Sequence, residues 1–197
     1  MKEILIATKN AGKAKEFKVL FERYGIHAKS LLDLAEEVPD IEETGVTFEE
    51  NAALKSEGIE KLLHISVMAD DSGLEIDALD GRPGIYSARY AGEPKDDKKN
   101  IQKVLQELAD VPKEKRTARF VCVLSVTIPG QPTLFKKGYC EGAIAFEAKG
   151  ENGFGYDPIF IPNGYSTTMA ELMPEEKNKI SHRRNAMIQL EDWIKNQ

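Results

Sequence analysis

RTARFVCVLSVTI (Arg116–Ile128) and TLFKKGYCEGAIAF (Thr133–Phe146) are the two stretches that decide the fold. Both are long and rich in β-branched and aromatic residues, which are typical of strands. The segment between them is Pro129-Gly130-Gln131-Pro132, and proline and glycine favour turns. The pattern predicts two long antiparallel strands joined as a hairpin.

Strands alternate with helices on both sides of this hairpin. Lys2–Ala7 is expected to form a buried first strand. Ala11–Tyr24 is expected to follow as a helix, because Phe17, Leu20 and Phe21 recur at helical spacing. The other expected elements are strands at His27–Leu31, Ser66–Ala69, Leu74–Ala78 and Pro158–Pro162, and helices from Thr47 to about His64, across Ile101–Leu108 and from Ser181 onward. Strand–helix units combined with an antiparallel ribbon predict an α/β fold with a long mixed β-sheet flanked by helices. We expect the ligand in a cleft between a core lobe and an appended lobe.

Composition narrows the class of protein. The 197 residues suit one domain with two lobes, and 41% apolar with 30% charged residues is ordinary for a globular protein. No apolar run is long enough for a membrane helix or a secretory signal, so we expect a cytoplasmic protein. Cys122 and Cys140 lie in apolar, strand-like stretches and are interpreted as buried reduced thiols. A net charge of −6 argues against non-specific nucleic-acid binding.

Charge is unevenly distributed along the chain. Asp33–Glu50 contains eight acidic and no basic residues, whereas basic residues gather at Lys9–Lys18 and Lys177–Arg184. Separate basic and acidic regions suit a polyphosphate bound with a divalent metal. Two solvated faces explain the same pattern equally well.

A polar segment, Thr8-Lys9-Asn10-Ala11-Gly12-Lys13, lies where the first strand gives way to the first helix. Exposed N–H groups and the positive end of the helix dipole favour anions at such a point. Thr8, Asn10 and Lys13 add polar and cationic side chains, so the segment predicts a phosphate site. An Asn10 N-cap on a surface helix is the alternative.

Two acidic segments supply oxygen ligands of the kind that Mg²⁺ prefers. Asp70 and Asp71 follow an apolar strand and precede Ser72-Gly73, which is also good turn chemistry. Glu42-Glu43 precedes a capping box formed by Thr47 and Glu50, and the box explains those two residues without any function. Either Asp70 or Asp71 could act on a water molecule, and the sequence does not separate them.

Two further segments are suited to recognising a nucleobase. Gly153-Phe154-Gly155-Tyr156-Asp157 interleaves aromatic rings with glycines, as a stacking platform would, although a tight turn with structural rings is the alternative. His182 and Arg183 lie with Lys177 near the start of the last helix, where cations are unfavourable unless something compensates them. Their donors suit the 6-oxo group of hypoxanthine or xanthine; a solvated basic patch is the alternative.

The ordered set of motifs closely resembles the non-canonical purine nucleoside triphosphate pyrophosphatase family, also called the inosine triphosphate pyrophosphatase or Ham1-like family. The resemblance spans Thr8 to Arg183 and rests on the segments TKNAGK, EETGVTFEENA, ADDSGLEIDAL, GIYSARYAG, GFGYDPIF and EEKNKISHR.

The resemblance implies a two-lobed Mg²⁺-dependent hydrolase of ITP, dITP and XTP, usually a homodimer, with its site in a central cleft. Asp71 would accept the proton of the attacking water and, with Glu42, bind the metal. The implied substrate-binding residues are Thr8, Lys9, Asn10, Ala11, Gly12, Lys13, Ser72, Phe154, Gly155, Tyr156, Asp157, Lys177, His182 and Arg183, with Lys55 as a further phosphate contact.

Three rival functions stay open at this point. One is a house-cleaning pyrophosphatase for modified pyrimidine nucleotides. Another is a non-catalytic module that senses ITP-like ligands, against which the acids Glu42, Asp70 and Asp71 argue. A nucleic-acid-binding role fits the acidic balance least.

Overall fold

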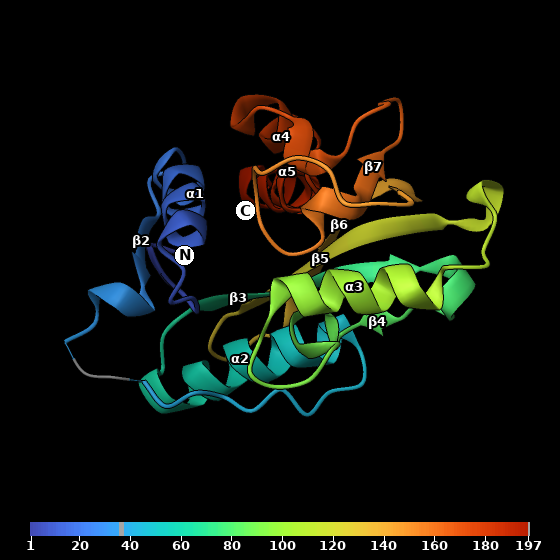
Figure 1. Cartoon of the computed structure of the whole chain (residues 1–197). Coiled ribbons are helices and arrows are strands. Elements are labelled where there is room, and N and C mark those ends of the chain that lie inside the picture. The colour runs from blue at the N-terminus through green and yellow to red at the C-terminus, as the bar shows by residue number, and fades with distance from the viewer. Residues whose placement is uncertain (36–37, 197) are drawn as a thin grey trace. The chain divides into compact units, whose positions relative to one another are not determined.

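The computed structural model describes residues 1–35 and 38–196 and has a mixed α/β architecture (Figure 1). The strands are β1 (Glu3–Ile6), β2 (His27–Ser30), β3 (Val67–Ile76), β4 (Pro83–Gly84), β5 (Thr117–Thr127), β6 (Leu134–Ile144) and β7 (Phe160–Pro162). The α-helices are α1 (Ala11–Glu22), α2 (Phe48–Leu63), α3 (Asp97–Glu107), α4 (Pro174–Ile180) and α5 (His182–Lys195). The predicted fold class is therefore confirmed. Glu36 and Glu37 of the predicted acidic stretch lie outside the described residues.

The strands form one mixed sheet in the order β2-β1-β3-β5-β6-β7, and β4 pairs with β3. β1 runs parallel to both β2 and β3, whereas the β3–β4 and β6–β7 pairs are antiparallel. β5 and β6 are the two long strands predicted as a hairpin, and they are neighbours in the sheet.

One local prediction was wrong. The segment Asp70–Gly73, expected to be a turn between two short strands, lies inside the continuous ten-residue strand β3. Local preference for a turn is outweighed because Asp70 and Asp71 are buried and their carboxylates have lysine partners.

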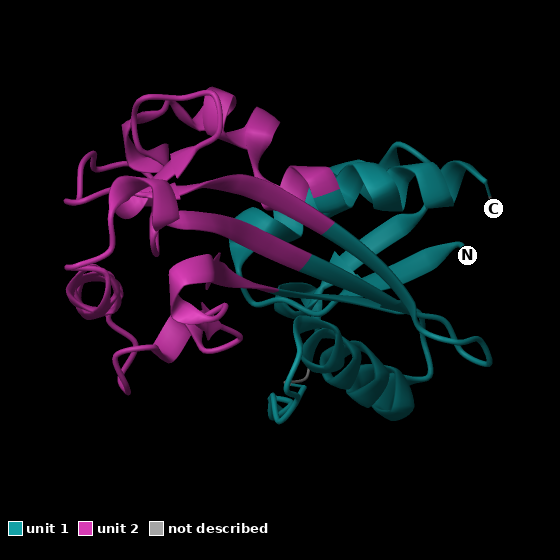
Figure 2. Cartoon of the chain, turned by 90° about the vertical axis from the view of Figure 1, so that its right-hand side faces the viewer, with its two compact units in different colours: residues 1–71, 123–137, 186–197 teal, residues 72–122, 138–185 magenta. Residues whose placement is uncertain are grey.

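Contacts divide the chain into two compact units (Figure 2). Unit 1 comprises residues 1–71, 123–137 and 186–197, and unit 2 comprises residues 72–122 and 138–185. Strands β3, β5 and β6 contribute residues to both units. The expected cleft between two lobes stays a prediction.

Unit 1 contains the starts of α1 and α2. The apolar residues Phe17, Leu20 and Phe21 of α1 are buried, and burying such side chains stabilises the fold by about 1.5–3 kcal/mol each. Thr47 caps α2 by accepting a hydrogen bond from the Glu50 N–H. The Glu50 carboxylate accepts from the Val46 N–H, one residue before the position expected for a capping box.

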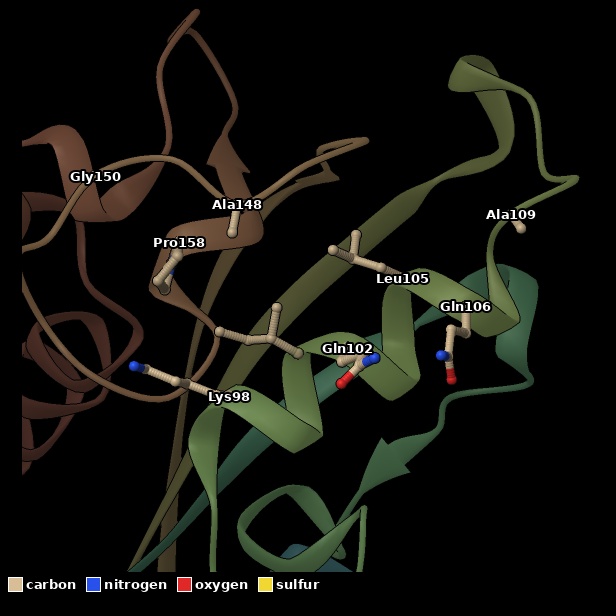
Figure 3. Close-up of a pocket in the computed structure, with 9 residues that line it drawn as sticks. Lys98, Gln102, Leu105, Gln106, Ala109, Ala148, Gly150 and Pro158 are labelled. Atoms are coloured by element: carbon tan, nitrogen blue, oxygen red, sulfur yellow. The ribbon is translucent and has the colours of Figure 1, made fainter.

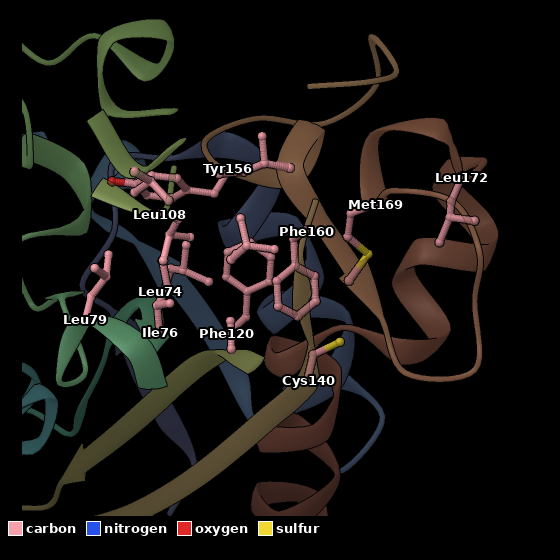
Figure 4. Close-up of a cluster of buried hydrophobic side chains, with 14 residues drawn as sticks. Leu74, Ile76, Leu79, Leu108, Phe120, Cys140, Tyr156, Phe160, Met169 and Leu172 are labelled. Carbon is pink, nitrogen blue, oxygen red and sulfur yellow. The ribbon is translucent and has the colours of Figure 1, made fainter. Parts of the chain in front are cut away.

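Unit 2 has its own apolar core, shown in Figure 4. The rings of Phe120 and Phe160 lie with their centroids 4.4 Å apart, and Leu74 and Tyr156 belong to the same buried cluster. Cys140 also belongs to this cluster, and Cys122 is buried as well, in accordance with the sequence-based interpretation. Within the described chain, every helix falls short of the length and apolar character that a bilayer crossing demands.

Candidate active site

The segment between β1 and α1 is held by its own polar side chains. The Asn10 side chain accepts a hydrogen bond from the Lys13 N–H at 3.0 Å, and the Asn10 N–H donates to the Thr8 hydroxyl at 3.1 Å. Thr8 is buried, whereas Lys9 is exposed and pairs with Asp40. The N-cap interpretation of Asn10 is therefore correct, and the phosphate site at the start of α1 stays a prediction.

Lys13 and Lys55 are both held by the acidic residues of β3. The Lys13 ammonium lies 2.6 Å from the Asp70 carboxylate. The Lys55 ammonium donates to the Asp70 carbonyl oxygen at 2.6 Å and lies 3.6 Å from the Asp71 carboxylate and 3.1 Å from that of Glu43. Unit 1 thus brings two cations and three carboxylates together; we name Lys13, Lys55, Asp70, Asp71 and Glu43 the charge cluster.

Asp70 and Asp71 differ because neighbouring residues of a strand point to opposite faces. Asp70 accordingly pairs with Lys13 of α1, and Asp71 with Lys55 of α2. Had these residues formed the expected turn, both carboxylates could have converged on one metal. The strand geometry leaves Asp71 as the carboxylate that shares its surroundings with Glu43 and Lys55.

The electrostatics also single out Asp71. Burial raises its pKa to about 6, although the Lys55 ammonium opposes that shift, and the Glu43 carboxylate adds to it. Burial acts to lower the pKa of Lys55, but Asp71, Asp70 and Glu43 outweigh it and raise that pKa. A carboxylate with a pKa near neutrality is suited to exchanging a proton with water.

Asn51 links the acidic loop to this cluster. Its side chain oxygen accepts a hydrogen bond from the Gly45 N–H at 2.8 Å, and its side chain also hydrogen-bonds Asp71 and lowers the pKa of that carboxyl. A Cβ at position 45 would lie 2.7 Å from the Asn51 oxygen, so only glycine allows this close approach. The loop that carries Glu42 and Glu43 is thereby attached to the start of α2.

The charge cluster fits a magnesium ion by the chemistry of its donors. Mg²⁺ needs only one or two carboxylates when substrate phosphates and waters complete its shell. Asp71 and Glu43 supply such oxygens, and a cation beside them would offset the burial that raises the pKa of Asp71. Across residues 1–35 and 38–196, no three His, Cys, Asp or Glu side chains converge as a ready-made metal site. Glu42, the predicted ligand, is exposed, and its assignment stays a prediction.

The sequence analysis included Glu43 in a segment that could bind a metal, but it assigned only Glu42 as the ligand. The adjacent pair Glu42-Glu43 was the available signal, but a loop without periodicity does not indicate which carboxylate faces inward. The structure places the Glu43 side chain against Lys55.

Unit 2 carries the predicted base-binding residues. Phe154 is 61% exposed, whereas Tyr156 is only 5% exposed and donates its hydroxyl hydrogen bond to the Ser87 carbonyl oxygen at 2.8 Å. The sequence did not separate the two rings as stacking surfaces; in the structure the accessible one is Phe154.

Lys177 and Asp157 support the Phe154 ring. The Asp157 carboxylate is buried, accepts a hydrogen bond from the Phe154 N–H at 2.8 Å and pairs with the Lys177 ammonium. That ammonium also lies 4.7 Å from the centroid of the Phe154 ring. Gly153 has φ +82°, and a Cβ there would lie 2.1 Å from the Asp157 carboxylate, which explains the glycine. We name Gly153–Asp157 the platform loop.

The start of α5 presents the other predicted base-recognition residues. Ser181 caps this end by accepting a hydrogen bond from the Arg184 N–H at 3.1 Å. His182 and Arg183, half-buried in its first turn, follow the cap, and the His182 ring stacks on Phe120 at 5.1 Å between centroids. The imidazole is thus fixed in orientation by an aromatic contact. Ser72 lies beyond Asp71 in β3.

Similarity to known proteins agrees with the motif order. The model of the Ham1 family matches residues 4–193. The chain belongs to the Ham1 family. This Ham1 chain is 64% identical over 194 residues to the dITP/XTP pyrophosphatase of Oceanobacillus iheyensis, with 98% of each chain covered. It is 58% identical over 190 residues to the dITP/XTP pyrophosphatase of Bacillus subtilis, with 96% of each covered.

Solved structures of Ham1 proteins have the same fold. The Ham1 protein of Staphylococcus aureus matches with a TM-score of 0.92 at 51% identity, covering 99% of both chains. A dITP/XTP pyrophosphatase from Mycobacterium abscessus matches with a TM-score of 0.83 at 41% identity, over 95% of this Ham1 chain and 98% of that one. The resemblance stated from the motifs is confirmed.

Proposed function

We propose that this Ham1 chain hydrolyses the non-canonical purine nucleoside triphosphates dITP, XTP and ITP to the nucleoside monophosphate and pyrophosphate. The names of relatives at 54–64% identity, dITP/XTP pyrophosphatases, supply the substrate class. The observation that carries the proposal to this chain is the charge cluster, in which the buried Asp71 carboxylate lies 3.6 Å from the Lys55 ammonium.

In the proposed reaction, Asp71 accepts the proton of the attacking water. In the metal-free chain burial raises its pKa to about 6, which leaves the carboxylate mostly ionised at pH 7 and able to accept a proton. Asp70 positions Lys13 through their ion pair. Asp71 with Glu42 or Glu43 would hold Mg²⁺, which would supply positive charge to neutralise the phosphates.

The phosphates bind where the two lysines and the start of α1 supply positive charge. The first N–H groups of α1, with Thr8, Lys9, Asn10, Ala11 and Gly12 around them, bind phosphate oxygens. Lys13 and Lys55 exchange part of their contact with Asp70 and Glu43 for the phosphates and stabilise the leaving pyrophosphate.

The base is held by the residues of unit 2. Phe154 offers its exposed ring for stacking, and Lys177 remains beside that ring. His182 and Arg183 donate to the 6-oxo group of hypoxanthine or xanthine. Adenine has an amino group there, which leaves those donors without an acceptor, so adenine nucleotides are rejected. Ser72, Gly155 and Asp157 complete the contacts with base and sugar.

The proposal includes a cytoplasmic location, expected from the apolar pattern of the sequence, and a homodimer, carried from the family resemblance. Size-exclusion chromatography with light scattering tests the dimer: a mass near twice 22.0 kDa supports it, and a mass near 22.0 kDa contradicts it.

The test of the activity is pyrophosphate release from ITP, XTP, dITP, ATP and GTP, each with Mg²⁺ and with excess chelator. We expect fast release from the first three, little from ATP, and loss of all release with chelator. Binding of ITP without pyrophosphate release would instead support a nucleotide-sensing module. Release that is equally fast with chelator would overturn the magnesium assignment alone.

A further inference from the structure

The platform loop is a short glycine-rich segment attached to unit 2 by a few polar contacts. Tyr156 attaches it through the Ser87 carbonyl oxygen, and Asp157 attaches it through Lys177. A third contact comes from outside the motifs used so far: the Gly155 N–H donates to the Asp97 carboxylate at 2.9 Å. Asp97 is the first residue of α3.

Apolar packing connects α3 with the end of the platform loop, because Val104 and Tyr156 belong to the same buried cluster. A pocket of about 690 Å³ is bordered by the α3 residues Lys98 and Leu105 on one side and by Ala148, Gly150 and Pro158 on the other (Figure 3). Beside this space, the Asp97–Gly155 hydrogen bond is a direct polar contact from α3 to the platform loop.

The hydrogen bond with Asp97 meets the platform loop at Gly155, where it affects the backbone conformation of the loop. Gly155 has φ +58°, a conformation that favours glycine, and the space where a Cβ would lie is open. Its N–H lies in the chain between the exposed Phe154 ring and the buried Tyr156 ring. Fixing the Gly155 peptide therefore fixes the angle at which Phe154 projects.

From these contacts we infer that Asp97 is a positioning residue that holds the platform loop, and thereby the Phe154 ring, in the orientation that stacks on the purine base. Asp97 touches the loop backbone and not the substrate. The inference rests on the proposed function for its substrate, but the loop contact itself exists without substrate.

Asp97 has a matched control in its neighbour. Asp96 is an acidic residue at the same end of α3, but its carboxylate caps the helix by accepting a hydrogen bond from the Lys99 N–H at 3.1 Å. Asp96→Ala therefore weakens the same helix terminus without touching the platform loop. Asp97→Asn keeps an acceptor oxygen for the Gly155 N–H while it removes the charge.

The experiment combines steady-state kinetics on ITP with hydrogen–deuterium exchange of the peptide covering the platform loop, on the full chain. We expect Asp97→Ala to raise KM about five- to tenfold with kcat nearly unchanged, as loss of one partly exposed hydrogen bond to a carboxylate implies. Exchange in the platform loop should speed up in the same variant. Asp97→Asn should restore most of both properties, and Asp96→Ala should lower the melting temperature while KM and loop exchange stay near wild type.

Unchanged loop exchange in Asp97→Ala would overturn the inference, as would an equal rise of KM in Asp96→Ala, which would make the effect one of helix stability. If the wild-type chain released no pyrophosphate from any nucleotide, the proposed function would fail. The exchange measurement would then still decide whether Asp97 holds the loop.

Discussion

The charge cluster is held mainly by ion pairs, whereas the platform loop combines backbone hydrogen bonds with the Asp157–Lys177 ion pair. In the charge cluster, side chains neutralise one another: Lys13 pairs with Asp70, and Lys55 with Glu43 and Asp71. In the platform loop, backbone groups are held by neighbours, as the Phe154 N–H is by Asp157. Ion pairs can exchange partners when an anion and a cation arrive, whereas backbone hydrogen bonds preserve a shape. The comparison teaches that the part proposed for chemistry can rearrange its partners, and the part proposed for recognition is formed in advance.

The largest expected effect comes from breaking the chemistry of the charge cluster. Asp71→Asn should lower kcat for ITP by about a thousandfold or more, because it removes the proposed proton acceptor and a metal ligand together. Pyrophosphate release measures the loss, and circular dichroism verifies that the fold persists. Asp70→Asn is the matched variant, and we expect it to retain more activity. Substantial turnover by Asp71→Asn would move the role of base to another residue.

The recognition side is tested by selectivity. Alanine at His182 or Arg183 should reduce the preference for ITP over ATP about ten- to a hundredfold, because the donors that distinguish a 6-oxo from a 6-amino group are lost. The ratio of kcat/KM values for the two nucleotides is the measurement. A uniform loss for both nucleotides would show that these residues contact phosphate or sugar.

The same Asp71→Asn variant should also change how the free energy of unfolding depends on pH. The pKa of Asp71 is raised to about 6 in the folded chain. Between about pH 4 and pH 6 the Asp71 carboxyl is therefore protonated in the folded state and ionised in the unfolded state. Stability contributed by this group therefore falls as pH rises through that window. Asp71→Asn should gain on the order of 3 kcal/mol relative to wild type at pH 7.5 and lose that advantage near pH 4.

Urea unfolding at both pH values, with chelator present, measures this difference. An advantage that is the same at pH 4 and pH 7.5 would show that the burial of the charge is not its source.

The smallest effect is expected in the platform loop. Tyr156→Phe removes only the hydroxyl that donates to the Ser87 carbonyl oxygen and keeps the buried ring. We expect a loss of about 1 kcal/mol in unfolding free energy and little change in kcat. Thermal or urea unfolding measures it; a loss of activity larger than the loss of stability would indicate that Tyr156 also contacts the substrate.

Patterns that repeat along the chain predicted the fold well. The hairpin of β5 and β6 and the buried stripe of α1 follow from side-chain type and spacing alone. The segment Asp70–Gly73 was predicted as a turn because Asp-Ser-Gly favours turns locally. Its extended form depends on Lys13 and Lys55, which are distant in sequence.

The candidate site was predictable at the level of motifs but less so at the level of single side chains. The motifs predicted that Lys13, Asp70 and Asp71 belong to one site. In the structure Lys13 pairs with Asp70, and Asp71 is the next residue of the same strand. The sequence does not show which of the two aromatic rings is accessible for stacking. In the structure Phe154 is exposed and Tyr156 is buried. Nothing in the sequence indicated a role for Asp97, because acidic residues are common in the first turn of a helix.

The division of the chain into units has a consequence for how this protein can be altered. The boundary falls first between Asp71 and Ser72, inside one strand, and the polypeptide passes between the units four times before it ends. Neither unit is therefore a continuous piece of sequence, and no single cut of the gene would separate them. A new base preference cannot be acquired by exchanging one continuous segment of sequence for unit 2. Such an exchange is possible in proteins whose domains are consecutive in the sequence. Here the new preference has to arise by point changes or by replacement of a loop such as Gly153–Asp157, with the strands that carry the charged residues left in place.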